Sequence, residues 1–258
     1  MHKQYVRFVH GGATQYGLVR GNRVFAITGD LFGEHEQTTV SFSTDEIRLL
    51  VPCQPGKVVC VGLNYRRHAE ELSLPIPEEP VLFMKPPSTL VASEEEIVYW
   101  PETSRLDYEG ELAAVIGKPC HRVSEGSALD YVFGYTIAND VTARDLQQKD
   151  GQWTRGKCFD TFLPLGPVLT TSIDASDLAL QTHLNGALKQ DGRTSDLIFP
   201  LPHLVSFISH VMTLNPGDVI ITGTPSGIGP MQIGDTVEVS IEGLGTLRNK
   251  VRGLAERG

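Results

Sequence analysis

The chain has 258 residues, 40% of them hydrophobic, and a net charge of −9, which fits one globular domain, or one domain with a small appendage. The acidic balance argues against nucleic acid as a partner, and no apolar run approaches the length of a membrane span. The four cysteines lack the paired spacing of a zinc or redox motif, and no secretory signal is seen at the N-terminus, so we expect a cytoplasmic protein.

The first fifty residues predict a small β-rich unit. Residues 4–9 and 16–27 read as strands, the second broken by a turn at residues 20–23. The unit ends near the proline- and glycine-containing residues 52–56. We therefore expect a small β-rich N-terminal domain over residues 1–54 and a main domain over residues 55–258.

A short strand over residues 57–62 precedes a predicted helical segment that contains His68 and Glu71. On a helix these two side chains are i,i+3 neighbours on one face. Such a pair is most often a weak exposed contact, and the alternative is a general base whose imidazole is held by the carboxylate. The next predicted strand ends on Lys85, which is either solvated or placed at the mouth of an anion site.

Two carboxylates, Glu109 and Glu111, stand at the head of the apolar run in LDYEGELAAVIG (106–117). If this segment is a strand, both side chains project from the same face. Two like charges on one buried face are costly unless a cation or a proton lies between them. A Glu-x-Glu pair is also common on exposed strands, so its spacing alone does not decide between the two environments.

A third carboxylate, Asp140, ends the strand predicted over residues 131–140. It can cap a helix predicted over residues 141–147, or it can join Glu109 and Glu111. Three carboxylates with no histidine or cysteine at ligand spacing suit Mg²⁺, Mn²⁺ or Ca²⁺ rather than zinc. The loop over residues 152–167 then places Lys157 between apolar neighbours.

The last third of the chain predicts a hairpin, a core helix and a glycine-rich loop. Asn185 and Gly186 mark the hairpin turn. A stripe of apolar residues after Pro202 predicts an amphipathic helix that packs in the core: Leu204, Phe207, Ile208, Val211 and Met212. The loop over residues 223–229 lacks the spacing of a P-loop or dinucleotide motif, although its backbone N–H groups and the Thr224 hydroxyl can contact a carboxylate.

These segments together resemble the fumarylacetoacetate hydrolase family, in the branch of acylpyruvate hydrolases, oxaloacetate decarboxylases and homoprotocatechuate-pathway isomerases. The resemblance runs from about residue 57 to residue 253. It rests on six blocks in order: VGLNYRRHAEEL (61–72), PVLFMKP (80–86), DYEGELAAVIG (107–117), GYTIANDVTARDLQ (134–147), GKCFDTFLPLGP (156–167) and NPGDVIITGTPSGIG (215–229). It implies an α+β, mainly β fold, with a family-type β-roll catalytic domain after the N-terminal unit, and a homodimer.

The resemblance also assigns residues. It implies metal ligands Glu109, Glu111 and Asp140, catalytic residues His68, Glu71 and Lys157, and substrate contacts Lys85, Gln147 and Thr224. The implied metal is Mg²⁺ or Mn²⁺, with Ca²⁺ able to replace either in a crystal. Some acylpyruvases have arginine where this chain has Leu63, which removes one carboxylate contact.

The implied substrate is a small 2-oxo or 2,4-dioxo acid. The expected reaction is acylpyruvate hydrolysis or oxaloacetate decarboxylation through a metal-stabilised enolate. One alternative is isomerisation or tautomerisation of oxaloacetate or 2-hydroxyhepta-2,4-diene-1,7-dioate at the same site. A second alternative is a non-catalytic homologue that binds a metal or a metabolite.

Overall fold

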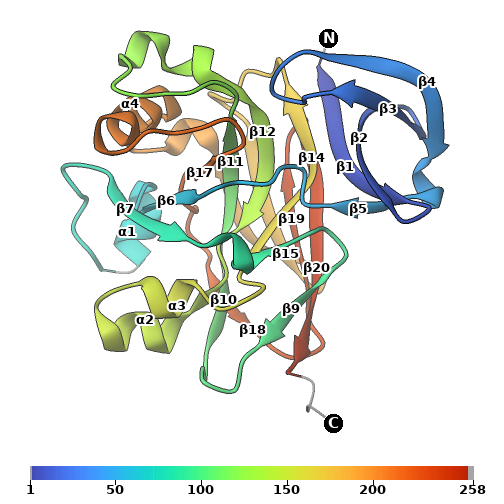
Figure 1. Cartoon of the computed structure of the whole chain (residues 1–258). Helices are drawn as coiled ribbons and strands as arrows, with labels where there is room; N and C mark the ends of the chain where they lie inside the picture. The colour runs from blue at the N-terminus through green and yellow to red at the C-terminus, as the bar shows by residue number, and fades with distance from the viewer. Residues whose placement is uncertain (1, 72, 255–258) are drawn as a thin grey trace.

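The computed structural model describes residues 2–71 and 73–254, and strands dominate this part of the chain (Figure 1). Twelve of its strands form one sheet with the order β4-β3-β2-β1-β14-β12-β11-β17-β6-β7, in which β5 joins β1 and β8 joins β14. Their bounds are β1 Lys3–His10, β2 Ala13–Arg20, β3 Arg23–Gly29, β4 His35–Ser43, β5 Arg48–Leu50, β6 Val58–Gly62, β7 Val81–Lys85, β8 Leu90–Val91, β11 Gly110–Ile116, β12 Val132–Asn139, β14 Leu163–Thr171 and β17 Val219–Ile221.

Two smaller sheets and four α-helices complete the described fold. The five-stranded sheet has the order β16-β15-β19-β20-β9, and the three-stranded sheet has the order β13-β10-β18. Their bounds are β9 Glu96–Tyr99, β10 Leu106–Tyr108, β13 Thr142–Ala143, β15 Ala179–Leu184, β16 Ala187–Arg193, β18 Gly229–Met231, β19 Thr236–Ile241 and β20 Gly245–Gly253. The helices are α1 Arg66–Glu71, α2 Arg144–Asp150, α3 Thr154–Lys157 and α4 Leu201–Val211, and none in the described ranges could span a bilayer. The mainly β fold expected from the sequence is confirmed.

The N-terminal strands continue the main sheet rather than standing apart from it. Strand β1 pairs antiparallel with β14, with Lys3 opposite Thr171 and Tyr5 opposite Leu169. Figure 1 shows β1–β4 curling away at one end of this sheet. The predicted strands here are confirmed, whereas the division into domains 1–54 and 55–258 stays a prediction.

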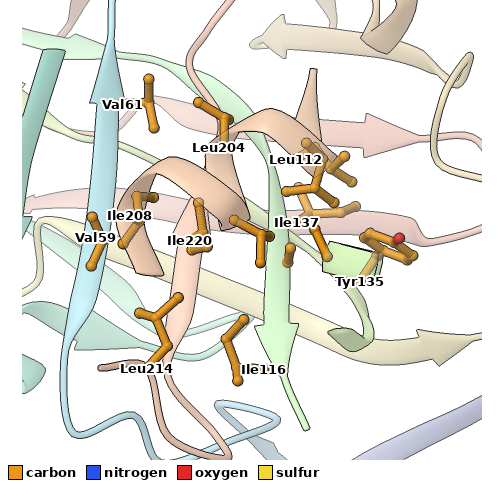
Figure 2. Packing of buried hydrophobic residues seen from close by; sticks show 14 of the residues in the cluster. Val59, Val61, Leu112, Ile116, Tyr135, Ile137, Leu204, Ile208, Leu214 and Ile220 are labelled. Carbon is orange, nitrogen blue, oxygen red and sulfur yellow. The ribbon is translucent and has the colours of Figure 1, made fainter. Parts of the chain in front are cut away.

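Strand β11 lies between two hydrophobic cores, which explains its unbroken apolar sequence. Leu112 and Ile116 face one core, formed with α4 and the five-stranded sheet (Figure 2). Ala113 and Val115 face the second core on the other side of the sheet. A strand buried on both faces is held firmly in register, so residues at its start are rigidly placed.

Helix α4 confirms the predicted amphipathic helix, with two corrections to its buried stripe. Phe207 is only partly buried and stacks on His203. Leu204 and Ile208 point into the core with Ile220 (Figure 2). Val211 was expected to be buried but is 62% exposed, because it is the last residue of the helix and lies beyond the packed face.

Two predicted boundaries near the carboxylates are wrong. The strand expected over residues 106–117 is divided at Glu109, since β10 pairs with β13 and β18 while β11 pairs with β12 and β17. The helix expected from residue 141 begins at Arg144, and Ala143 occupies its N-cap position. Asp140 therefore does not cap this helix. The two residues that follow Val141 pair instead with β10.

Helix α2 is attached to the loop before β10 through Asp145. The Asp145 carboxylate accepts hydrogen bonds from Thr103 Oγ1 at 2.5 Å, Ser104 N at 3.0 Å and Ser104 Oγ at 2.9 Å. Partial burial raises the pKa of Asp145, but these hydrogen bonds outweigh it and lower the pKa to about 2.

We expect Asp145→Asn to lower the free energy of unfolding at pH 7 by about 1 kcal/mol, because the amide cannot accept all three hydrogen bonds. A carboxylate with a depressed pKa stabilises the fold above its unfolded pKa, and this contribution is lost as pH falls through the folded pKa. The deficit of the variant should therefore shrink between about pH 4 and pH 2. Urea unfolding at several pH values tests this, with exposed Asp160→Asn as control. An equal deficit at all pH values would contradict it.

Candidate metal and substrate site

Three carboxylates meet where β11 begins and β12 ends. Glu109 lies between β10 and β11, Glu111 lies in β11, and Asp140 follows β12 directly. The ladder pairs Glu111 with Ala138, and Asp140 N donates to Glu109 O at 2.8 Å. One oxygen from each carboxylate lies within 4.8 Å of the others, and all three side chains are buried. The structure therefore brings together the three residues expected to bind a metal.

Buried cations compensate two of these carboxylates. Lys157 Nζ lies 2.9 Å from Glu109 Oε2 and 2.5 Å from Asp140 Oδ2. Lys85 Nζ lies 2.7 Å from Asp140 Oδ1, and Arg144 contacts Glu109. Burial by itself raises the pKa of Glu109, but Lys157 and Arg144 hold that pKa below its ordinary value.

Glu111 has a different environment. It makes no ion pair within residues 2–71 and 73–254, and its Oε2 accepts a hydrogen bond from Gly223 N at 2.6 Å. Burial, together with the charges of Asp140 and Glu109, raises the pKa of Glu111 well above its ordinary value. A buried all-oxygen cluster with one carboxylate lacking a cation fits a hard divalent cation, which can occupy the place that a proton otherwise takes.

The carboxylates open into a cavity of about 220 Å³. Its polar lining consists of Glu109, Glu111, Asp140, His68, Arg144, Gln147, Gln148, Lys157 and Thr224. The remaining lining consists of Val61, Gly62, Leu63, Leu74, Phe83 and Trp153. The cavity thus combines a charged side with an apolar side, and its volume suits a small organic acid.

His68 and Glu71 lie on α1, and only Glu71 is exposed, so the pair is not the fully exposed contact that such spacing usually gives. His68 is only 4% exposed and lines the cavity, and its Nδ1 lies 3.2 Å from Glu71 Oε2. The other carboxylate oxygen, Glu71 Oε1, accepts from Gly227 N at 3.0 Å. Glu71 is therefore fixed from two sides, and when Nδ1 donates to it, His68 Nε2 is left able to accept a proton.

The structure places Lys85 differently from the substrate contact expected of it. Lys85 is fully buried beneath Asp140 and does not line the cavity. Its ammonium also donates to Val141 O at 3.0 Å and Phe162 O at 2.6 Å. These two hydrogen bonds and the ion pair with Asp140 use all three N–H donors of the Lys85 ammonium. Lys85 therefore compensates the charge of Asp140 and does not donate to a substrate.

The other two expected substrate contacts do line the cavity. Gln147 Oε1 accepts from Arg144 at 2.6 Å. The Thr224 hydroxyl donates to Gly110 O at 2.9 Å, so its hydrogen is already used and cannot go to a substrate carboxylate as expected.

Arg144 and Asp107 belong to the site but were not expected there from the sequence. Arg144 Nε donates to Asp107 Oδ2 at 2.9 Å, and both side chains are buried. The signal available was their presence in the same family-like blocks that carry Glu109 and Asp140, but nothing in the spacing shows that a residue before β11 meets one after β13. Together they connect α2 to the carboxylate cluster.

Comparison with known proteins identifies two matching segments. Residues 57–252 match the model of the fumarylacetoacetate hydrolase C-terminal domain, and residues 3–52 match an Rv2993c-like N-terminal domain. Among curated relatives, oxaloacetate tautomerase YisK of Bacillus subtilis is 45% identical over 230 residues, which cover 81% of this chain and 75% of the relative.

Solved structures support the same relationship as these two matching segments. A structure described as 2-hydroxyhepta-2,4-diene-1,7-dioate isomerase from Mycobacterium marinum is 42% identical, has a TM-score of 0.92, and covers 98% of this chain and 100% of its own. Fumarylpyruvate hydrolase from Pseudomonas aeruginosa, in complex with Mn²⁺ and pyruvate, is 33% identical with a TM-score of 0.75, covering 80% of this chain and 92% of its own. The matched domain, the identities and the shared fold show that this chain belongs to the fumarylacetoacetate hydrolase family.

Proposed function

We propose that this protein is a divalent-metal-dependent enzyme that forms enolates of small 2-oxo acids, with keto–enol tautomerisation or isomerisation as its first candidate reaction. The observation that supports this proposal most directly is the cluster of three buried carboxylates, which opens beside His68 into a cavity of about 220 Å³. The relatives support the order of candidates, because those described as a tautomerase and an isomerase are 45% and 42% identical, against 38% and 33% for two structures described as hydrolases.

Glu109, Glu111 and Asp140 would hold the cation. Mg²⁺ and Mn²⁺ both suit an all-carboxylate site, and the hydrolase from Pseudomonas aeruginosa contains Mn²⁺. The bound cation would supply Lewis-acid polarisation of the 2-oxo group and stabilise charge on the enolate oxygen. The remaining steps belong to side chains of this chain.

His68 is the proposed base. Glu71 holds its imidazole in place, so the free nitrogen can take a proton from the carbon next to the oxo group. Lys157, buried at the same cluster, adds positive charge where the enolate oxygen develops negative charge. The protonated His68 then gives this proton to the enolate oxygen to complete the enol, or to a different carbon in an isomerisation, so the proton is conserved and His68 returns to its starting state.

Hydrolysis of acylpyruvates is the second candidate. It is favoured by the placement of His68 on the cavity wall, where the same nitrogen can activate water, and by the likeness to the fumarylpyruvate hydrolase. Decarboxylation of oxaloacetate needs only the stabilised enolate. A non-catalytic homologue is disfavoured, because His68 and Lys157 line the same cavity as the carboxylates and Glu71 contacts His68. A homodimer in the cytoplasm, expected from the sequence, stays a proposal.

A turnover panel with Mn²⁺ or Mg²⁺ tests the proposal. The substrates are oxaloacetate, with keto–enol exchange and CO₂ release followed separately, 2-hydroxyhepta-2,4-diene-1,7-dioate, acetylpyruvate and fumarylpyruvate. We expect metal-dependent proton transfer to be the fastest reaction. Faster C–C cleavage of an acylpyruvate would reverse the order of the candidates, and no turnover of any substrate would support the non-catalytic alternative.

We expect Glu111→Gln to weaken Mn²⁺ binding by at least about 100-fold, because it removes the charge of a ligand while keeping its size, and loss of even an outer-shell partner costs 10–100-fold. Calorimetric titration of the metal-free protein measures this. The control is Glu242→Gln, an exposed carboxylate at the end of β19. Unchanged Mn²⁺ affinity in Glu111→Gln would rule out the proposed metal site.

We expect His68→Gln to lower kcat by about 10²–10⁴-fold, the usual contribution of a general base, with Mn²⁺ affinity retained. The matched control is His203→Gln, since His203 also lies 3.2 Å from a glutamate, Glu125, but on the surface. A wild-type kcat in His68→Gln would assign proton transfer to another group.

A further inference from the structure

Strand β16 is mostly exposed to solvent, but one of its polar residues is buried. Its burial pattern marks only Gln190 as buried, and this polar side chain is completely inaccessible to solvent. Strand β16 is an edge strand of the five-stranded sheet, beside the loop over residues 223–229. Burying an amide on an edge strand is costly unless each of its polar groups is hydrogen-bonded.

All the polar groups of Gln190 are used, and they join two parts of the metal site. Its Oε1 accepts from Gly110 N at 3.0 Å. Its Nε2 donates to Thr224 Oγ1 at 2.7 Å and to Pro225 O at 2.8 Å. The Thr224 hydroxyl then donates to Gly110 O at 2.9 Å. Gly110, Gln190 and Thr224 thus form a closed ring of hydrogen bonds, whose donor order is fixed because a backbone N–H can only donate.

The backbone at the ring and beside it packs too closely for a side chain at two glycines, Gly110 and Gly227. A Cβ on Gly110 would lie 2.4 Å from Thr182 Oγ1 and 2.9 Å from Val239 Cγ1. On the loop, a Cβ on Gly227 would lie 2.1 Å from Lys189 O, next to Gln190. Both glycines therefore allow the backbone to approach β16 closely enough for the Gln190 amide to reach both sides.

Both the strand side of the ring, at Gly110, and its loop side, at Thr224, are next to Glu111 or to a residue that positions it. Gly110 is the residue between Glu109 and Glu111, so fixing its N–H and C=O fixes the backbone that carries both carboxylates. The loop side carries Gly223, whose N–H donates to Glu111 Oε2. Gln190 itself does not line the cavity and so cannot touch a substrate there.

We propose that Gln190 is a positioning residue of the metal site. It acts through Gly110 and Thr224 to hold the Glu111 carboxylate in position relative to Glu109 and Asp140. The inference rests on the proposed metal-dependent function. Mg²⁺ and Mn²⁺ require their ligands at defined positions, and outer-shell partners that orient the ligands have large effects on affinity. Gln190 would orient the ligands from the five-stranded sheet, whereas Glu111 belongs to the twelve-stranded sheet.

The test compares Mn²⁺ affinities of the metal-free, full-length protein by calorimetry. Gln190→Met keeps the side-chain length and removes all three hydrogen bonds, and we expect its Kd for Mn²⁺ to rise by about 10–100-fold. Thr224→Val breaks the ring at one point and should weaken binding less, while Thr224→Ser, which keeps the hydroxyl, should restore most of the lost affinity. The double variant Gln190→Met/Thr224→Val should bind no more weakly than Gln190→Met alone, because both belong to one ring.

The control is Gln181→Met on the neighbouring strand β15, where the glutamine amide donates to exposed Asp191 and has no contact with the ring. The electron paramagnetic resonance spectrum of bound Mn²⁺ provides a second readout, since it should change in Gln190→Met if the ligand geometry changes. A merely structural role would lower the unfolding temperature without changing either the Kd or the spectrum of the folded protein.

The outcomes separate this inference from the proposed function. Wild-type affinity and spectrum in both Gln190→Met and Thr224→Val would overturn the positioning role and leave the metal site intact. No Mn²⁺ binding by the wild-type protein would overturn both. If Gln190→Met does not fold, the Thr224→Val and Thr224→Ser pair decides, because equal affinities in that pair contradict the ring.

Discussion

Mutual repulsion between three buried carboxylates is the constraint on which the rest of this structure depends. Charges this close and this poorly hydrated persist only with compensation, and the three carboxylates do not receive it equally. Glu109 has Lys157 and Arg144, Asp140 has Lys157 and Lys85, and Glu111 has a single backbone N–H. The compensation is incomplete at Glu111, and this incompleteness is what makes the cluster receptive to a divalent cation.

The supporting groups come from every part of the central fold. Strand β11 is held between two cores, so the glutamates at its start have a rigid base. Lys85 ends β7, Lys157 ends α3, and the glycine-rich loop follows β17. Figure 1 shows α1, α2 and α3 on the side of the sheet where β6 and β7 lie, and the cavity draws residues from all of these helices. The site is therefore a property of the whole arrangement and not of one motif.

The sequence predicted the groups that carry chemistry better than those that support them. Glu109, Glu111 and Asp140 were found because carboxylates at strand ends stand out, and family-like blocks joined them. Lys85 was misplaced because a strand pattern shows where a side chain leaves the backbone but not what covers it. The helix start was set too early because Asp140 is a good cap on local rules, while its partners Lys85 and Lys157 lie far away in sequence. Gln190 escaped notice because its strand, ALKQDGR, reads as a solvated hairpin arm.

The break between β10 and β11 has a consequence for how the cavity is built. Glu109 stands at a seam between a three-stranded sheet and the large one, and α2, which carries Arg144 and Gln147, follows directly from that small sheet. The small sheet and this helix share a third core, which contains Leu106, Ala143 and Leu146 and is distinct from the two cores around β11. One wall of the cavity is therefore built on its own packing unit, and the pairing of Arg144 with Glu109 is what connects that wall to the carboxylates.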